Sequence, residues 1–226
     1  MPVRKHTDDF FREKKKIKNP IKFNLQLNSE QKEAKQVILD NTITLLAGKA
    51  GSGKTLLAVQ VALDLFFKRQ VNKIIMTRPT VSTEDNGFLP GSEKEKMNPW
   101  LVPIKSNMRK VYNKPEILDK LESSEDIELV SLAHFRGRTF ENAVCIVDEF
   151  QNLTKSQLKM CVGRLGKNSL MIFTGDSQQI DLKDRNHSAI NELPKFRDCD
   201  YVFVTKLTEN HRHEAINTVL DILSNY

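Results

Sequence analysis

The sequence predicts a single α/β domain whose mainly parallel sheet is covered by helices on both faces. From residue 23 onward, apolar runs of strand length alternate with longer segments of helical periodicity, which is the pattern of such a sheet. Residues 144–147 are all apolar, as expected of a central strand buried on both sides. The chain has 226 residues, 39% of them hydrophobic, which is enough for one full core but not for two large domains.

Composition excludes several other classes of protein. Charged residues make up 28% of the chain, which is typical of a folded protein and not of a disordered one. The longest apolar stretch, residues 56–67, is interrupted by Gln60 and Asp64 and is shorter than the ~20 residues that cross a bilayer. The N-terminus has no apolar segment of a secretory signal, and the three cysteines form no CxxC pair. We therefore expect a cytoplasmic protein with no membrane association.

The net charge of +6 is concentrated in residues 1–22, which carry eight basic and three acidic side chains and so a local charge of +5. The rest of the chain carries only +1. We therefore divide the chain into a basic N-terminal arm, residues 1–22, and a domain, residues 23–226. The arm is either a solvated terminus or an electrostatic contact for a nucleic-acid backbone.

The elements of the domain follow from periodicity and from capping residues. Strands are expected over residues 42–47, 73–79, 127–132, 143–150, 169–176 and 201–207. Helices are expected from the N-cap Asn28 to Asp40, from Lys54 to about Arg69, from Thr154 to a cap at Gly166, and at the end of the chain to about Leu223.

A long irregular segment is expected after Pro79. Its prolines and glycines, among them Pro90, Gly91 and Pro99, argue against long elements. An irregular segment of this size is uncommon in a compact domain unless it is functional. It contains the single tryptophan, Trp100, which either packs the loop against the domain or stacks on a nucleic-acid base.

The glycine-rich turn before the second helix reads GKAGSGKT, a complete match to the phosphate-binding loop GxxxxGKT. Its glycines let the backbone curl so that successive N–H groups point at phosphate oxygens, and the following helix adds its positive N-terminal dipole. Lys54 is placed to bridge the β- and γ-phosphates, and the Thr55 hydroxyl to bind Mg²⁺. The residues expected to surround the nucleotide's phosphates are Gly48, Lys49, Ala50, Gly51, Ser52, Gly53, Lys54 and Thr55.

An acidic pair, Asp148 and Glu149, ends the most apolar strand. The carboxyl ends of parallel strands form the ligand crevice of such a sheet, so this pair should face the phosphates. We assign Asp148 to Mg²⁺ and Glu149 to the general base that takes a proton from an attacking water. The expected cofactors are therefore ATP and Mg²⁺.

Six motifs in a fixed order resemble the PhoH family of phosphate-starvation-inducible ATPases. The likeness runs from about Gln31 to the C-terminus and rests on GKAGSGKT (48–55), TRP (77–79), GFLPG (87–91), RGRTF (136–140), DEFQN (148–152) and GDSQQIDL (175–182). This chain departs from the family at residues 163–166, where GRLG replaces the usual Thr-Arg-Ile/Val-Gly, and has DEFQN in place of DEAQN. The resemblance implies a RecA-like domain similar to the first lobe of superfamily 1 helicases, ATP binding, action on RNA, and ring-like homo-oligomers such as hexamers.

The resemblance also implies roles for two glutamines. Gln179, in the pattern GDxxQ, would sense the γ-phosphate. Gln31 lies in a segment that resembles the helicase Q motif, where it would read adenine. The capping-box position predicts instead that Gln31 only closes the N-terminus of its helix.

Several arginines are candidates for contacts between subunits or with nucleic acid. Helicase-like ATPases stabilise γ-phosphate charge with an arginine from a facing lobe. We expect no second lobe here, so Arg164 or Arg212 of a neighbouring subunit would supply the arginine. Arg136 and Arg138 bind RNA phosphate or ATP in a neighbour, or they only hold the RGRTF turn. Arg78, at a strand end, is similarly placed. The pair His211 and His213 is assigned to a helix surface and not to a metal.

Together these patterns predict a protein that hydrolyses Mg·ATP, coupled to binding or remodelling single-stranded RNA or DNA. Two alternatives from other classes stay open. One is a P-loop phosphotransferase that acts on a small acceptor. The other is a nucleic-acid-binding module that is gated by a nucleotide without hydrolysing it.

Overall fold

The computed structural model describes residues 23–79, 93–210, 215, 216, 218, 219 and 222, and there it confirms the predicted fold class. All six described strands form one sheet in the order β3-β2-β4-β5-β1-β6, and every neighbouring pair is parallel. The strands are β1 (Ile43–Gly48), β2 (Lys73–Thr77), β3 (Ile127–Leu129), β4 (Ala143–Val147), β5 (Leu170–Gly175) and β6 (Val202–Leu207). The α-helices are α1 (Ser29–Asp40), α2 (Lys54–Phe67), α3 (Glu93–Val111), α4 (Pro115–Ser123) and α5 (Lys155–Val162).

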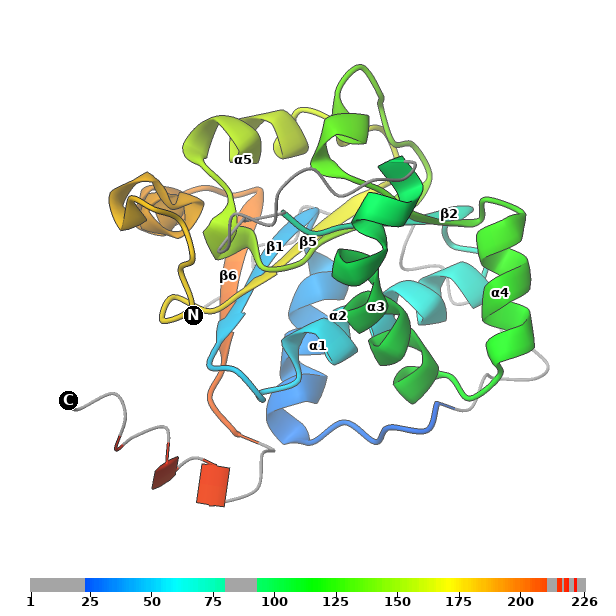
Figure 1. Cartoon of the computed structure of the whole chain (residues 1–226), viewed down its shortest axis with the longest axis horizontal. Coiled ribbons are helices and arrows are strands. Elements are labelled where there is room, and N and C mark those ends of the chain that lie inside the picture. Colours follow the sequence, from blue (N-terminus) through cyan, green and yellow to red (C-terminus); the bar gives the residue numbers. More distant parts are fainter. Residues whose placement is uncertain (1–22, 80–92, 211–214, 217, 220–221, 223–226) are drawn as a thin grey trace.

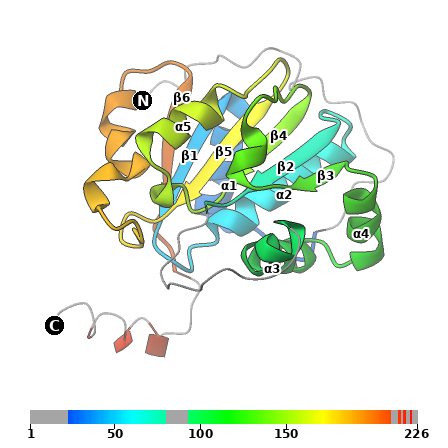
Figure 2. The same cartoon turned by 45° about the horizontal axis from the view of Figure 1, so that its top comes forward.

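Helices cover both faces of the sheet, as expected (Figures 1 and 2). Helices α1 to α4 lie on one face, and α5 lies on the other together with short 3₁₀ segments (Figure 2). These segments are η2 (Leu132–Phe135), η3 (Phe150–Asn152), η4 (Arg185–His187) and η5 (Ala189–Phe196). The two layers leave the carboxyl ends of the strands open to a ligand, which is where α/β sheets bind one.

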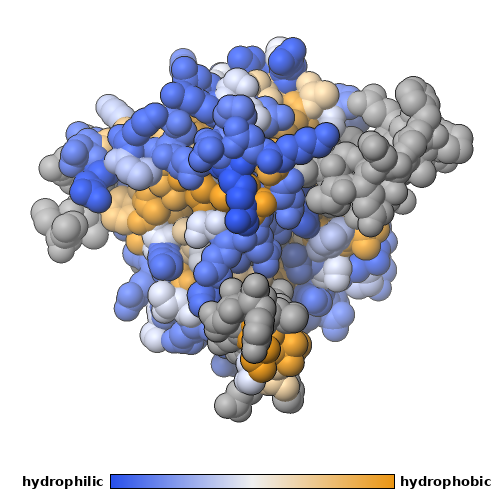
Figure 3. Space-filling view, turned by 60° about the vertical axis from the view of Figure 1, so that its left-hand side comes forward, coloured by the Kyte–Doolittle hydropathy of each residue, from blue (hydrophilic) through white to orange (hydrophobic). Residues whose placement is uncertain are grey.

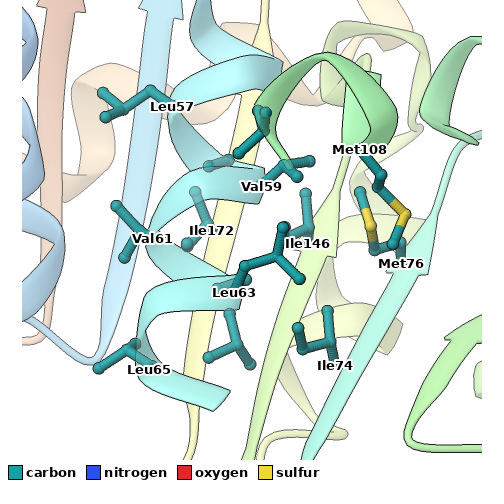
Figure 4. Packing of buried hydrophobic residues seen from close by; sticks show 14 of the residues in the cluster. Leu57, Val59, Val61, Leu63, Leu65, Ile74, Met76, Met108, Ile146 and Ile172 are labelled. Atoms are coloured by element: carbon teal, nitrogen blue, oxygen red, sulfur yellow. The ribbon is translucent and has the colours of Figure 1, made fainter. Parts of the chain in front are cut away.

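Helix α2 is the centre of the larger core (Figure 4). Its side chains Leu57, Val61 and Leu63 are fully buried against the sheet, beside Ile146 of β4 and Ile172 of β5. A helix that is apolar almost all round must be buried in this way, as the sequence predicted. Since α2 begins with Lys54 and Thr55, the last two residues of the phosphate loop, this packing fixes that loop against the sheet.

The structure corrects the prediction of a long irregular segment after Pro79. Residues 80–92 lie outside the described part of the chain, but α3 begins at Glu93 and continues through Pro99 and Trp100 to Val111, and α4 follows. The helix persists because Leu101, Ile104 and Met108 recur at helical spacing and pack into the core of α2. Their burial offsets the ~3 kcal/mol that an interior proline costs a helix.

The end of α5 also differs from the prediction. The N-cap Thr154 and a capping box with Gln157 are as expected, but the helix ends at Val162 and not at Gly166. Gly166 instead donates its N–H to Phe140 O (2.8 Å), in a short pairing that precedes β4 and β5. A Cβ there would lie 2.7 Å from that same oxygen, so this close approach requires glycine. The predicted helix at the C-terminus falls only in part within the described residues.

Strand β6 forms an edge of the sheet and exposes apolar side chains. Tyr201, Phe203 and Val204 are exposed at this edge, and Figure 3 shows an apolar band on the side of the molecule where β6 lies. Among the described helices, none is both long and apolar enough to pass through a lipid bilayer.

Candidate functional site

The candidate site lies where β1, β5 and β4 end side by side. Strand β5 pairs with β1 on one side and with β4 on the other, so the phosphate loop after β1 and the acidic pair after β4 flank the end of β5. All three ends point the same way because the strands are parallel. The topology therefore brings together two motifs that are 93 positions apart in the sequence, as the contact between Thr55 and Asp148 shows.

The phosphate loop has the curled backbone that its glycines predict. Gly53 has φ of +82°, and a Cβ there would lie 2.8 Å from the Gln31 amide nitrogen, so both conformation and space require glycine. The N-cap residue of α2, Gly53, makes no side-chain capping hydrogen bond, and the dipole of the helix is directed at the loop. Lys54 donates from Nζ to the carbonyls of Gly48 (2.8 Å) and Lys49 (3.0 Å) and so reaches back over the loop. A β- or γ-phosphate bound in the loop would contact this ammonium group.

Asp148 is joined to the phosphate loop through a hydroxyl. Its Oδ1 accepts hydrogen bonds from Thr55 Oγ1 (2.8 Å) and from Thr174 Oγ1 on β5 (2.5 Å), and its side chain is 5% exposed. A hydroxyl beside a carboxylate, next to a loop for phosphates, fits Mg²⁺, which keeps waters and uses few protein ligands. Within residues 23–79 and 93–210, no three His, Cys, Asp or Glu side chains gather to hold a metal. Mg²⁺ at Thr55 and Asp148 would therefore depend on phosphate oxygens and water for its other ligands.

Glu149 stands beside Asp148 in a left-handed backbone conformation, with φ of +54°. Its two carboxylate oxygens accept hydrogen bonds from Arg78 (3.3 Å) and from the Gln151 amide (2.6 Å). Burial, and next the charge of Asp148, raise the pKa of Glu149 above its ordinary value, while the bond from Gln151 lowers it. A carboxylate with a raised pKa is a stronger proton acceptor, which suits the base that we predict.

Gln151 connects the acidic pair to the end of β5, and the sequence analysis did not assign it a role. Its amide nitrogen also donates to Gln179 O (2.9 Å), and its amide oxygen accepts from Asp176 N (3.1 Å). Asp176 in turn accepts the N–H of Ala50, in the phosphate loop, at 2.7 Å. A continuous set of hydrogen bonds thus runs from the loop to Glu149. The signal in the sequence was the position of Gln151 two residues after a strand-end carboxylate pair.

A pocket of about 560 Å³ opens beside the phosphate loop. Lys54, Thr55, Glu149 and Gln179 line one part of it, so the predicted base and the predicted γ-phosphate sensor face the same space. This volume is in the range of small-ligand sites, about 300–1,000 Å³. Gln31 lines the pocket as well, and it also forms the predicted capping box with Asn28.

The predicted arginines lie at different distances from this pocket. Arg78 contacts the acidic pair, with its guanidinium 3.9 Å from Asp148 Oδ2. Arg138 pairs through both terminal nitrogens with Glu128 (2.8 and 3.0 Å) and lies over the Phe140 ring, so it holds the RGRTF turn. Arg136 is exposed in that turn. Arg212, the histidines 211 and 213, and the basic arm lie outside the described residues.

Arg164 is remote from the phosphate loop of its own chain. Its backbone carbonyl accepts the N–H of Phe140 (2.8 Å) just before β4 and β5 begin, whereas the loop lies where the strands end. The side chain donates to the carbonyls of Met160 and Arg138, each at 3.4 Å. A contact between Arg164 and a bound nucleotide would therefore have to join two subunits.

Comparison with known proteins gives matches over most of the chain. The family described as PhoH-like protein matches residues 25–224. The PhoH-like protein of Mycobacterium leprae (strain TN) is 38% identical over 200 residues, which cover 87% of this chain and 57% of that protein. The PhoH-like protein of Bacillus subtilis (strain 168) is 42% identical over 195 residues, 84% of this chain and 61% of that protein. This chain thus spans little more than half the length of these relatives.

Among solved structures, the large terminase from a thermophilic bacteriophage aligns with 87% of this chain and 50% of its own, with a TM-score of 0.52 and 10% identity. This likeness shows the fold alone. It agrees with the RecA-like arrangement of a parallel sheet and phosphate loop that the sequence predicted.

Proposed function

Because the chain belongs to the PhoH family, we propose that it binds Mg·ATP at the phosphate loop and hydrolyses it by in-line attack of water. The observation that carries the proposal is the hydrogen bond of 2.8 Å between Thr55 and Asp148, which unites the loop with the acidic pair. A phosphate loop alone supports nucleotide binding, whereas a loop joined to Asp148, with Glu149 next to it, supports hydrolysis.

Each residue has a stated role in this reaction. Loop amides and the Lys54 ammonium would hold the β- and γ-phosphates. Thr55 and Asp148 would hold Mg²⁺, which would supply positive charge beside the phosphate oxygens. Glu149 accepts the proton of the attacking water, and Arg78 and Gln151 orient its carboxylate. Gln179, at the edge of the same pocket, contacts the γ-phosphate.

Release of free phosphate separates hydrolysis from transfer to a small acceptor. Incubation with γ-labelled ATP should yield inorganic phosphate as the labelled product in the absence of any added acceptor. A label that appears only on an added small molecule would support a phosphotransferase instead.

We further propose that hydrolysis is coupled to single-stranded RNA or DNA, in the cytoplasm, by a ring-like homo-oligomer such as a hexamer. The exposed arginine in the RGRTF turn and the charge of +5 in the arm support contacts with a nucleic-acid backbone. The exposed apolar edge at β6 supports an interface between copies of the chain. Arg164 lies away from the phosphate loop of its own chain, which supports a contact with the nucleotide of a neighbouring subunit.

Phosphate release should therefore depend on both RNA and protein concentration. Single-stranded RNA should raise kcat severalfold, and the rate per chain should rise steeply with protein concentration, because an arginine supplied by a neighbour is worth ~10³ or more in rate. Steady-state phosphate release, measured across protein dilutions with and without RNA, checks both expectations. A rate per chain that stays constant on dilution, while sedimentation shows dissociation to monomers, would contradict the shared site.

Removal of residues 1–22 should weaken binding to single-stranded RNA in a manner that depends on salt. If the five net charges of the arm neutralise five phosphates of a single strand, the counterions released correspond to a change of about 3 to 4 units in the slope of log K against log salt. Fluorescence anisotropy of labelled RNA, measured over a series of salt concentrations, gives this slope for the full chain and for the truncated one. Equal slopes would remove the arm from the binding surface.

A further inference from the structure

The pocket beside the phosphate loop extends well past the phosphates. Its lining includes Gln60 of α2, and also residues 25–27 and Asn107 and Lys110 of α3. Gln60 follows Lys54 by six residues, or about 9 Å along the helix. This is a distance that an α-phosphate and a ribose span, so the far end of the pocket is where the base of a bound nucleotide would lie.

Gln31 is already engaged within the protein beside the phosphate loop. Its amide oxygen accepts the N–H of Asn28 (3.3 Å) in the capping box, and its amide nitrogen donates to Ser52 O (3.4 Å) in the phosphate loop. Its amide nitrogen would also lie 2.8 Å from a Cβ at Gly53. These contacts make Gln31 a positioning residue that holds the loop against the N-terminus of α1.

Gln60 differs from Gln31 in that one of its polar atoms is unsatisfied. The residue is 6% exposed, and its amide nitrogen donates a long hydrogen bond of 3.4 Å to Leu25 O. Its amide oxygen is buried and has no hydrogen-bond partner among the described residues. An unpaired buried acceptor is unfavourable, so a donor supplied by a ligand would restore a favourable interaction.

We propose that Gln60 is a specificity-determining residue that recognises the exocyclic amine of the base, as in adenine. Its oxygen accepts a hydrogen bond from that amine, and Leu25, Leu27 and Leu56 supply apolar contacts for the faces of the base. The oxygen is covered in the structure, so the amide turns about its last side-chain torsion to meet the base. The angles that this torsion adopts are broadly distributed, so the rotation is easy. It would weaken the hydrogen bond to Leu25, which is already long. The inference rests on the proposed binding of a nucleotide at the phosphate loop.

Three nucleotides that differ at the purine 6-position, of which the inosine nucleotide also carries a hydrogen on N1, test this role in the wild-type protein. ATP carries an amine there, purine riboside triphosphate carries hydrogen, and inosine triphosphate carries a carbonyl that would face the Gln60 oxygen. We expect affinity to fall in that order, by about five- to tenfold at the first step, as for the loss of one hydrogen bond. Calorimetric titration of each nucleotide with Mg²⁺ gives the three values of Kd.

The variant Gln60→Met keeps the length of the side chain and removes the amide. It should bind the three nucleotides with affinities within about twofold of one another, and it should bind purine riboside triphosphate as the wild type does. Its melting temperature without nucleotide reports whether it folds. The matched control is Gln31→Met, which should weaken all three nucleotides equally because Gln31 acts on the phosphate loop.

The outcomes separate this inference from the proposed function. If the wild type binds all three nucleotides equally, or if Gln60→Met retains the preference for ATP, Gln60 does not read the base even though nucleotide binding stands. If the preference is lost in Gln31→Met and kept in Gln60→Met, the amine is read by Gln31. If the wild type binds none of the three, the proposed nucleotide site itself is wrong.

Discussion

Replacement of Glu149 by Gln should lower kcat for phosphate release by ~10²–10⁴ and leave the affinity for Mg·ATP within about threefold. The amide has the shape of the carboxylate but cannot accept a proton from water. The phosphates are held by the loop, Lys54 and Thr55, none of which the substitution removes. Steady-state phosphate release gives kcat, and calorimetry with Mg·ATP gives the affinity of the same preparation.

A control for this variant is needed because both oxygens of Glu149 accept hydrogen bonds, from Arg78 and Gln151. The amide of the variant would direct its own N–H at one of these donors, which costs local stability. A melting temperature close to that of the wild type separates loss of the base from loss of the fold. Unchanged kcat in a folded variant would contradict the role of Glu149. Loss of ATP binding together with turnover would assign Glu149 to binding instead.

Replacement of Lys54 by Ala should weaken Mg·ATP binding by about 100-fold, which is the effect of losing charge-assisted hydrogen bonds worth about 3 kcal/mol. In the structure, the Lys54 ammonium contacts the loop carbonyls of Gly48 and Lys49, so its removal should change the free energy of unfolding little. Calorimetric titration measures the first effect, and thermal unfolding measures the second.

The matched control for Lys54 is Lys68→Ala at the other end of the same helix. Lys68 is exposed and pairs with Asp64 at 2.9 Å. It lies at the end of α2 that is remote from the phosphate loop. This variant should bind Mg·ATP as the wild type does. Equal affinities in the Lys54 and Lys68 variants would show that the loop does not hold the triphosphate.

The parts of the fold that were predictable from sequence are those with a strong local pattern. The phosphate loop, the apolar α2 and the apolar strand β4 each combine residue type with periodicity, and the structure has all three. Helix α3 was missed because Pro99 and Pro103 lie inside it and a local rule places prolines at helix ends. The helical spacing of Leu101, Ile104 and Met108 was present in the sequence. These side chains stabilise the helix only by packing against α2, which lies beside α3 in the folded chain.

The motif residues of the candidate site were predictable from the sequence, but the hydrogen bonds that connect them were not. Thr55 and Asp148 were each assigned from a motif, and the structure brings them within 2.8 Å. The role of Gln151 could not be predicted, because it depends on which strand lies next to β4. The order β4-β5-β1 places Asp176 between Gln151 and the phosphate loop. For the same reason, the unsatisfied oxygen of Gln60 is a property of the packed structure and not of any motif.

Titration calorimetry of the wild-type chain with ATP, with and without Mg²⁺, tests the central claim most directly. The account predicts saturable binding of one ATP per chain, tighter with Mg²⁺ than without it, since Thr55 and Asp148 lie together beside the phosphate loop. Absence of binding heat at several temperatures in both conditions, with a protein that unfolds cooperatively, would contradict it.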